Sequence, residues 1–120
     1  MDEKKTEHLL KSYPKLYRNR MYFACGDGWF EIIDELSKNL EPLIEEIEGL
    51  DEVWMPYVTD VKEKWGTLRF YMSCETDKMS KFIREAELKS KVTCEACGSP
   101  GKIRGGHWIV TLCDKCDKKS

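Results

Sequence analysis

The stretch that decides how this chain is built reads Cys94-Glu-Ala-Cys97 and, after the fifteen residues 98–112, Cys113-Asp-Lys-Cys116. Two Cys-x-x-Cys pairs at this separation match the spacing of a four-thiolate zinc site, in which each pair forms a tight turn and the sulfurs converge on one ion. Four protein ligands leave no coordination position for a substrate, so we expect one structural Zn²⁺ per chain. Two disulfides or four unrelated buried cysteines are the alternatives, and the repeated two-residue gap favours the metal.

The residues between the two cysteine pairs are predicted to form a short hairpin, with Ile103 opposite Trp108 across Gly105-Gly106. This pairing predicts one apolar face, made by Ile103, Trp108, Val110 and Leu112, and one polar face, made by Lys102, Arg104 and His107. His107 is a possible further metal ligand, but four cysteines already complete a tetrahedral shell. The polar face is therefore a candidate binding surface rather than part of the metal site.

Composition limits the class of protein. The chain has 120 residues, six of them cysteine, and a formal net charge of −2, which suits one modest core with a small metal-stapled lobe. The first eight residues hold no apolar leader segment, and no apolar run approaches the roughly 20 residues that span a bilayer. We therefore expect a soluble, cytoplasmic protein without a membrane role, in a reducing compartment where Cys-x-x-Cys pairs bind metal. Cys25 and Cys74 are left over, as small buried hydrophobes or as reactive thiols.

Charge is unevenly distributed along the chain. Residues 31–60 hold ten acidic residues and one lysine, a balance of −9, whereas residues 81–120 hold nine basic and five acidic residues, a balance of +4. The acidic block argues against wrapping of nucleic acid by the whole surface, although a local basic face remains open.

Three helices are expected before the cysteine-rich stretch. One covers residues 2–12, the longest covers 29–49 with Asp27 as its N-cap, and the third covers 78–89 with Asp77 as its cap. Pro42 is expected either to kink the long helix or to divide it in two. Residues 15–23 have no clean periodicity and are interpreted as an irregular segment packed on the core, and residues 117–120 are expected to fray.

A β-hairpin is predicted over residues 57–73, with Val61 opposite Phe70, because this register places the apolar residues of both strands on one face. The opposite face then holds Lys62, Lys64, Thr67, Arg69 and Tyr71. These side chains are either ordinary exposed strand residues or a small patch that binds an anion or an acidic partner.

The predicted fold class is α+β: a long helix packed on a small antiparallel sheet, with a C-terminal zinc ribbon. Residues 1–90 are assigned to the core and residues 91–120 to a zinc-ribbon lobe packed on it, as one compact unit. Motifs of the GxxxxGKS, HExxH and GxSxG types are absent, and the chain has only two histidines. We therefore expect no catalytic residues and no enzyme activity.

Three stretches, taken together, resemble a known family. They are Gly26-Asp-Gly-Trp-Phe-Glu-Ile-Ile-Asp-Glu-Leu36, Val61-Lys-Glu-Lys-Trp-Gly-Thr-Leu-Arg-Phe-Tyr71, and Cys94-x-x-Cys-Gly-x-Pro-Gly101 with Trp108-Ile-Val-Thr-Leu-Cys-Asp114. In this order they are similar to small, mostly uncharacterised bacteriophage and prophage proteins with a C-terminal four-cysteine ribbon. The resemblance covers most of the chain from Gly26 onward.

The resemblance implies an accessory protein that acts in the cytoplasm of a bacterial host. Proteins of this kind bind and block a host component, or sequester a small anionic, nucleotide-like defence signal, without catalysis. One alternative is a nucleic-acid-binding regulator that uses the ribbon, with Lys102, Arg104 and His107 as contacts. A metal-stabilised hydrolase is a second alternative. The expected partner is a host protein or small anionic ligand, nucleic acid is not favoured, and a homo-oligomer is considered.

Overall fold

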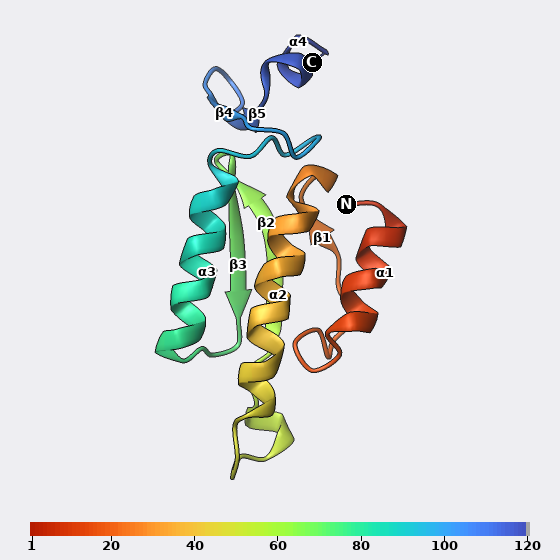
Figure 1. The fold of residues 1–120 in the computed structure, drawn as a ribbon, viewed down its shortest axis with the longest axis vertical. Helices are drawn as coiled ribbons and strands as arrows, with labels where there is room; N and C mark the ends of the chain where they lie inside the picture. Colours follow the sequence, from red (N-terminus) through yellow and green to blue (C-terminus); the bar gives the residue numbers. More distant parts are fainter. Residues whose placement is uncertain (120) are drawn as a thin grey trace.

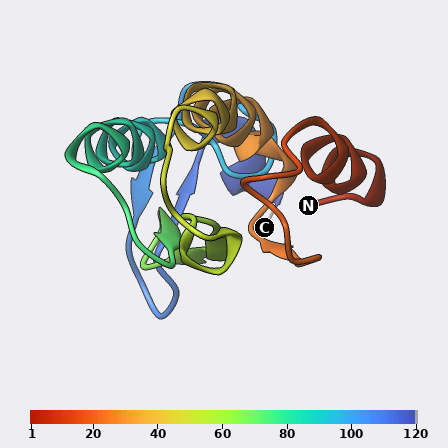
Figure 2. The ribbon, with the colours of Figure 1, turned by 90° about the horizontal axis from the view of Figure 1, so that it is seen from below.

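The computed structural model describes residues 1–119 as an α+β fold in which helices cover one face of a small sheet (Figures 1 and 2). The helical layer consists of α1 (Glu3–Ser12), α2 (Phe30–Glu45) and α3 (Asp77–Ser90). The molecule is elongated, 52 × 28 × 21 Å, with the cysteine-rich lobe at one end and the loop 46–57 at the other (Figure 1). No helix of the described residues is long and apolar enough to cross a membrane.

The sheet of the core has the order β1-β2-β3. β2 (Val58–Lys64) and β3 (Thr67–Met72) form the predicted hairpin, and the predicted register is confirmed because Val61 lies opposite Phe70. β1 (Phe23–Ala24) pairs with β2 in parallel, so the sheet is mixed rather than purely antiparallel. This strand begins at the last residue of the stretch 15–23, which is expected from the sequence to be irregular, and two residues are too few to show a period.

The turn of the hairpin is made by Trp65 and Gly66, with φ angles of 56° and 78°. Positive φ at both central residues is the geometry of a type I′ turn, which matches the twist of the two strands. Glycine adopts this geometry at no steric cost, whereas a bulky side chain such as that of Trp65 does so rarely.

The helix ends differ from those expected. A 3₁₀ turn, η1 (Asp27–Trp29), precedes α2, and Asp27 does not cap the helix because its Oδ1 accepts a hydrogen bond from the Asp2 N–H at 2.7 Å. α2 continues through Pro42 and ends at Glu45, without division. The cap of α3 is Thr76 rather than Asp77, with the Thr76 Oγ1 accepting from the Met79 N–H at 3.3 Å.

The core lies between the helices and the sheet. Its fully buried residues come mainly from α1, η1, α2, the hairpin and α3, and they include Leu9, Trp29, Ile33, Leu40, Val61, Leu68 and Met79. Strand β3 is an edge strand, and side chains of α3 accept from its outward N–H groups. The Ser90 Oγ accepts from the Leu68 N–H at 2.9 Å and the Glu87 Oε2 accepts from the Phe70 N–H at 3.0 Å. The exposed edge is therefore closed by the helix.

The register predicted for the hairpin in the lobe is wrong. β4 (Lys102–Arg104) pairs with β5 (Val110–Leu112) so that Ile103 lies opposite Thr111 rather than Trp108, and residues 105–109 form a longer turn. Thr111 decides the register because its buried Oγ1 donates to the Gly66 carbonyl oxygen at 2.5 Å. Lys102 and Arg104 consequently lie opposite Leu112 and Val110, so the predicted apolar and polar faces do not separate.

The end of the chain is helical where it was expected to fray. α4 spans Asp114–Lys119, directly after the third cysteine of the cluster. Ser120, the last residue of the predicted frayed tail, lies outside the described residues.

Candidate metal centre and its junction with the core

The four predicted cysteines form one cluster. The sulfur atoms of Cys94, Cys97, Cys113 and Cys116 all lie within 4.8 Å of one another, and the Cys97 and Cys113 sulfurs are 3.6 Å apart. Zinc–sulfur bonds of about 2.3 Å in a tetrahedron require sulfur–sulfur separations of about 3.8 Å. These spacings allow the four thiolates to hold one metal ion, and His107 is not part of the cluster.

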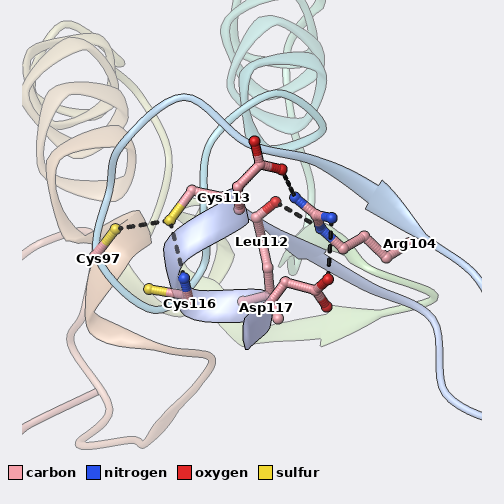
Figure 3. Close-up of polar contacts among 7 residues, drawn as sticks. Cys97, Arg104, Leu112, Cys113, Cys116 and Asp117 are labelled. Atoms are coloured by element: carbon pink, nitrogen blue, oxygen red, sulfur yellow. Dashed lines mark hydrogen bonds and ion pairs between the residues drawn. The ribbon is translucent and has the colours of Figure 1, made fainter. Parts of the chain in front are cut away.

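Local backbone structure brings each pair of sulfurs together. In the first pair, the Gly98 N–H donates to the Cys94 carbonyl oxygen at 2.9 Å, and Gly98 has a φ of 84°. In the second pair, the first turn of α4 places the Cys116 N–H 3.4 Å from the Cys113 sulfur (Figure 3). Each Cys-x-x-Cys therefore forms a tight turn, and in the second pair a backbone N–H points toward sulfur.

The surroundings of the thiols favour the thiolate form at two positions. The hydroxyl and backbone N–H of Ser99 lower the pKa of Cys97 to about 6. Burial raises the pKa of Cys94, but backbone N–H groups of Cys113, Cys97 and Ala96 outweigh burial and lower it. Because metals bind thiolate rather than thiol, these donors prepare the cluster for a cation.

Arg104 braces the second cysteine pair (Figure 3). Its Nε donates to the Leu112 carbonyl oxygen at 3.1 Å, and its two terminal nitrogens pair with Asp114 at 2.8 Å and Asp117 at 3.1 Å. A guanidinium group that makes three contacts holds β4 against the start of α4. Arg104 is therefore engaged within the lobe, whereas Lys102 and His107 are exposed.

The junction between lobe and core is formed by glycines of the Gly26-Asp-Gly-Trp stretch. The Gly28 N–H donates to the Glu95 carbonyl oxygen at 2.7 Å, and the Gly26 N–H donates to the Glu95 carboxylate at 2.8 Å. A Cβ atom added to Gly28 would lie 2.1 Å from the Cys94 carbonyl oxygen, so only glycine permits this approach. Burial of Glu95 raises its pKa, and the Gly26 N–H opposes that shift.

Two more contacts complete the junction. The indole Nε1–H of buried Trp29 donates to the Thr93 carbonyl oxygen at 2.9 Å, and the tip of the β2–β3 hairpin accepts the Thr111 hydroxyl at Gly66. The sequence stretches 26–36, 61–71 and 94–114 therefore meet at the boundary between lobe and core. The sequence analysis did not predict this junction. Gly26 and Gly28 could have indicated it, because helix capping does not require two glycines there and a close backbone approach does.

Figure 2 shows that α1, α2 and α3 cover one face of the sheet. Val61, Leu68 and Phe70 are buried on that face, so strand alternation places the candidate residues of the β2–β3 hairpin on the other face. We call this the open face and define it by Lys62, Lys64, Arg69 and Tyr71. Lys64 and Tyr71 are exposed and Lys62 and Arg69 are half-buried, while Thr67 is buried. None of the three cations forms an ion pair with any residue among those that the structure describes.

Comparisons of the chain with protein-family models, with curated proteins and with solved structures find no match.

Proposed function

We propose that this chain is a non-enzymatic, zinc-stabilised binding protein of the phage accessory type. It acts in the cytoplasm of a bacterial host, where it binds and blocks a host protein or sequesters a small anionic ligand. The observation that carries the proposal is the open face, a strand surface whose three cations form no ion pair with any of residues 1–119 and on which Asp60, opposite Tyr71, is the neighbouring carboxylate. Unpaired cations on a rigid sheet favour an acidic or phosphate-bearing partner.

The turn beside the open face supports a binding role. Trp65 is 65% exposed and has a φ of 56°, so a large apolar side chain stands in solvent in a backbone conformation that costs energy. Strained non-glycine residues are concentrated at ligand and partner sites, where another requirement outweighs stability. Aromatic side chains together with cations are also typical of the energetically important parts of interfaces.

The metal in the proposal is Zn²⁺, with a structural role. Four thiolates in a tetrahedral arrangement select zinc or an iron–sulfur centre, and a mononuclear closed shell of two Cys-x-x-Cys turns is typical of zinc. Elemental analysis of purified protein is expected to find one zinc per chain. Cys113→Ser should lose it and Cys74→Ser, outside the cluster, should keep it. Iron with visible absorption, or full zinc content in Cys113→Ser, would contradict this assignment.

The experiment that tests the function is affinity capture from infected bacterial cells, followed by identification of bound proteins and extracted nucleotides. The double variant Lys62→Glu/Lys64→Glu reverses two charges on the open face and is expected to lose the captured species. Its matched control, Lys4→Glu/Lys11→Glu, reverses two exposed lysines on α1 and should retain them. Equal capture by both variants would reject the open face, and nuclease-sensitive capture at physiological salt would favour the nucleic-acid alternative.

A further inference from the structure

A second group of cations lies where strand β3 meets α3. It shares Arg69 with the open face. A half-open cavity of about 190 Å³ lies there. Three cationic side chains line it: Arg69 from β3, Arg84 from α3, and Lys91, the C-cap residue that directly follows α3. Arg84 and Glu87 are three residues apart on α3, and Lys91, whose backbone is still helical, comes four residues later, so all three lie on one side of the helix.

The charges in this cavity do not balance. Against three cations it contains one carboxylate, that of Glu87, which leaves a balance of +2 (three minus one). The Glu87 Oε2 already accepts the Phe70 N–H at 3.0 Å. Neither Arg84, Lys91 nor Arg69 forms an ion pair within the part of the chain that the structure describes. The cationic groups that line the cavity could therefore donate charge-assisted hydrogen bonds to an anion.

The Arg69 side chain contains a nitrogen atom that lacks a hydrogen-bond partner within residues 1–119. Its Nε is buried and has no hydrogen-bond partner among the described residues. More than about 90% of buried polar groups in proteins are satisfied, and an exception calls for a partner such as a bound ion. Because this atom has almost no accessible surface, an anion in the cavity would accept from the N–H only after a shift of the Arg69 side chain.

The walls of the cavity are held in place. The Ser90 Oγ and the Glu87 carboxylate anchor α3 to two successive outward N–H groups of β3. Arg69 and Arg84 are therefore presented from regular, packed structure, and Lys91 directly follows the helix, which keeps their geometry defined before a ligand arrives.

Size restricts the ligand. Pockets for drug-sized molecules measure about 300–1,000 Å³, so a cavity of about 190 Å³ suits a small anion or the end of a larger ligand. Two guanidinium groups and an ammonium group match the oxygens of a phosphate group, which accept several charge-assisted hydrogen bonds at once. We propose that this pocket binds a phosphate group, either inorganic phosphate or the phosphomonoester end of a nucleotide-like ligand. The inference rests on the proposed function in its small-anion form.

Isothermal titration of the zinc-loaded full chain with inorganic phosphate, and separately with adenosine monophosphate, tests the pocket at constant ionic strength. Saturable binding is expected for at least one probe, and tighter binding of the nucleotide assigns the phosphomonoester as the source. Arg84→Gln and Lys91→Gln should each weaken binding about tenfold, because each removes one charge-assisted contact worth about one factor of ten or more. Lys62→Gln, a cation of the open face outside the pocket, should leave the affinity unchanged.

Three results would overturn the inference: no saturable binding of either probe, unchanged affinity in both α3 variants, or equal weakening by Lys62→Gln. Arg69→Gln adds a further check, since it should lower the affinity while leaving the melting temperature without phosphate nearly unchanged. A large loss of stability without phosphate would instead make Arg69 a structural residue. If phosphate fails to bind while Lys62→Glu/Lys64→Glu still abolishes capture, the pocket is rejected and the proposed function stands.

Discussion

At the scale of single residues, the lobe approaches the core closely where a glycine has no Cβ atom in the way. Gly28 and Gly105 illustrate the difference. A Cβ on Gly28 would lie 2.1 Å from the Cys94 carbonyl oxygen, whereas a Cβ on Gly105 would meet nothing within 4 Å. Neither residue has a positive φ, so the contrast between them is one of space rather than backbone strain.

Gly28→Ala is therefore expected to lower the free energy of unfolding by about 1–3 kcal/mol or more, because the backbone of the cysteine turn must move away. Gly105→Ala is the matched control and should change stability by less than about 0.5 kcal/mol. Chemical denaturation followed by circular dichroism measures both variants. Similar stability of the two would mean that the lobe does not sit against η1 as described.

The two cysteines outside the cluster differ in environment. Burial, followed by the nearby Glu95 carboxylate, raises the pKa of Cys25 to about 12, so its thiol stays protonated near neutral pH. Cys74 is exposed. Reactivity follows the thiolate fraction and access to the sulfur.

In the zinc-loaded protein, a thiol reagent at about pH 8, near the ordinary thiol pKa of about 8.5, is expected to modify Cys74 rapidly. Cys25 should react only after unfolding, and the four cluster cysteines only after chelation. Mass spectrometry of the modified peptides gives the order of reaction. Cys74→Ser should abolish the rapid phase, and rapid modification of Cys25 in the folded protein would contradict its burial.

At the scale of elements, the β2–β3 hairpin contributes to the core, to the contact with the lobe and to the proposed binding surface. Its inner face supplies buried Val61, Leu68 and Phe70 to the core, and its tip accepts the lobe through Gly66. Trp65 serves neither contact, since most of its side chain is exposed.

Replacing Trp65 by asparagine should stabilise the protein by about 1 kcal/mol, because the left-handed conformation costs a bulky residue roughly 1–2 kcal/mol and asparagine tolerates it. Thermal unfolding tests the stability, and the capture assay tests binding in the same variant. We expect a higher melting temperature together with weaker capture. A lower melting temperature would show that the indole packs on the fold.

At the scale of the whole molecule, the metal centre is joined to the core at three places. Gly28 meets Glu95, Trp29 meets the Thr93 carbonyl oxygen, and Gly66 meets Thr111. Structural zinc in comparable peptides contributes about 10–16 kcal/mol of apparent binding free energy. Because the centre is linked to the core in this way, we expect bound metal to stabilise the core as well as the two cysteine turns.

Removing the metal with a strong chelator should therefore lower the melting temperature of α1, α2 and α3 as well as that of the lobe. Far-ultraviolet circular dichroism reports chiefly on those helices, and a single transition that shifts down and recovers when zinc is restored is expected. Unchanged helix melting after complete metal loss would show that core and lobe fold independently.

Local pattern in the sequence was sufficient for several features. The two Cys-x-x-Cys pairs predicted the cluster because each pair is a local turn, and the apolar pattern of residues 57–73 predicted the Val61–Phe70 register because a shift by one residue exposes the core face. Helices α1, α2 and α3 were predicted from their periodicity, whereas α4 was not. The caps of α2 and α3 were not predicted either, since Asp27 is held by Asp2 and Thr76 precedes Asp77.

Other features were decided only by the tertiary structure, because they depend on contacts between residues far apart in the chain. β1 exists through parallel pairing with β2, and the β4–β5 register follows from Thr111 reaching Gly66. Arg104, a candidate binding residue by charge, is instead held by Asp114 and Asp117. The cavity lined by Arg69, Arg84 and Lys91 could not be predicted from the sequence. Only the packing of α3 against the edge of β3 brings these cations together.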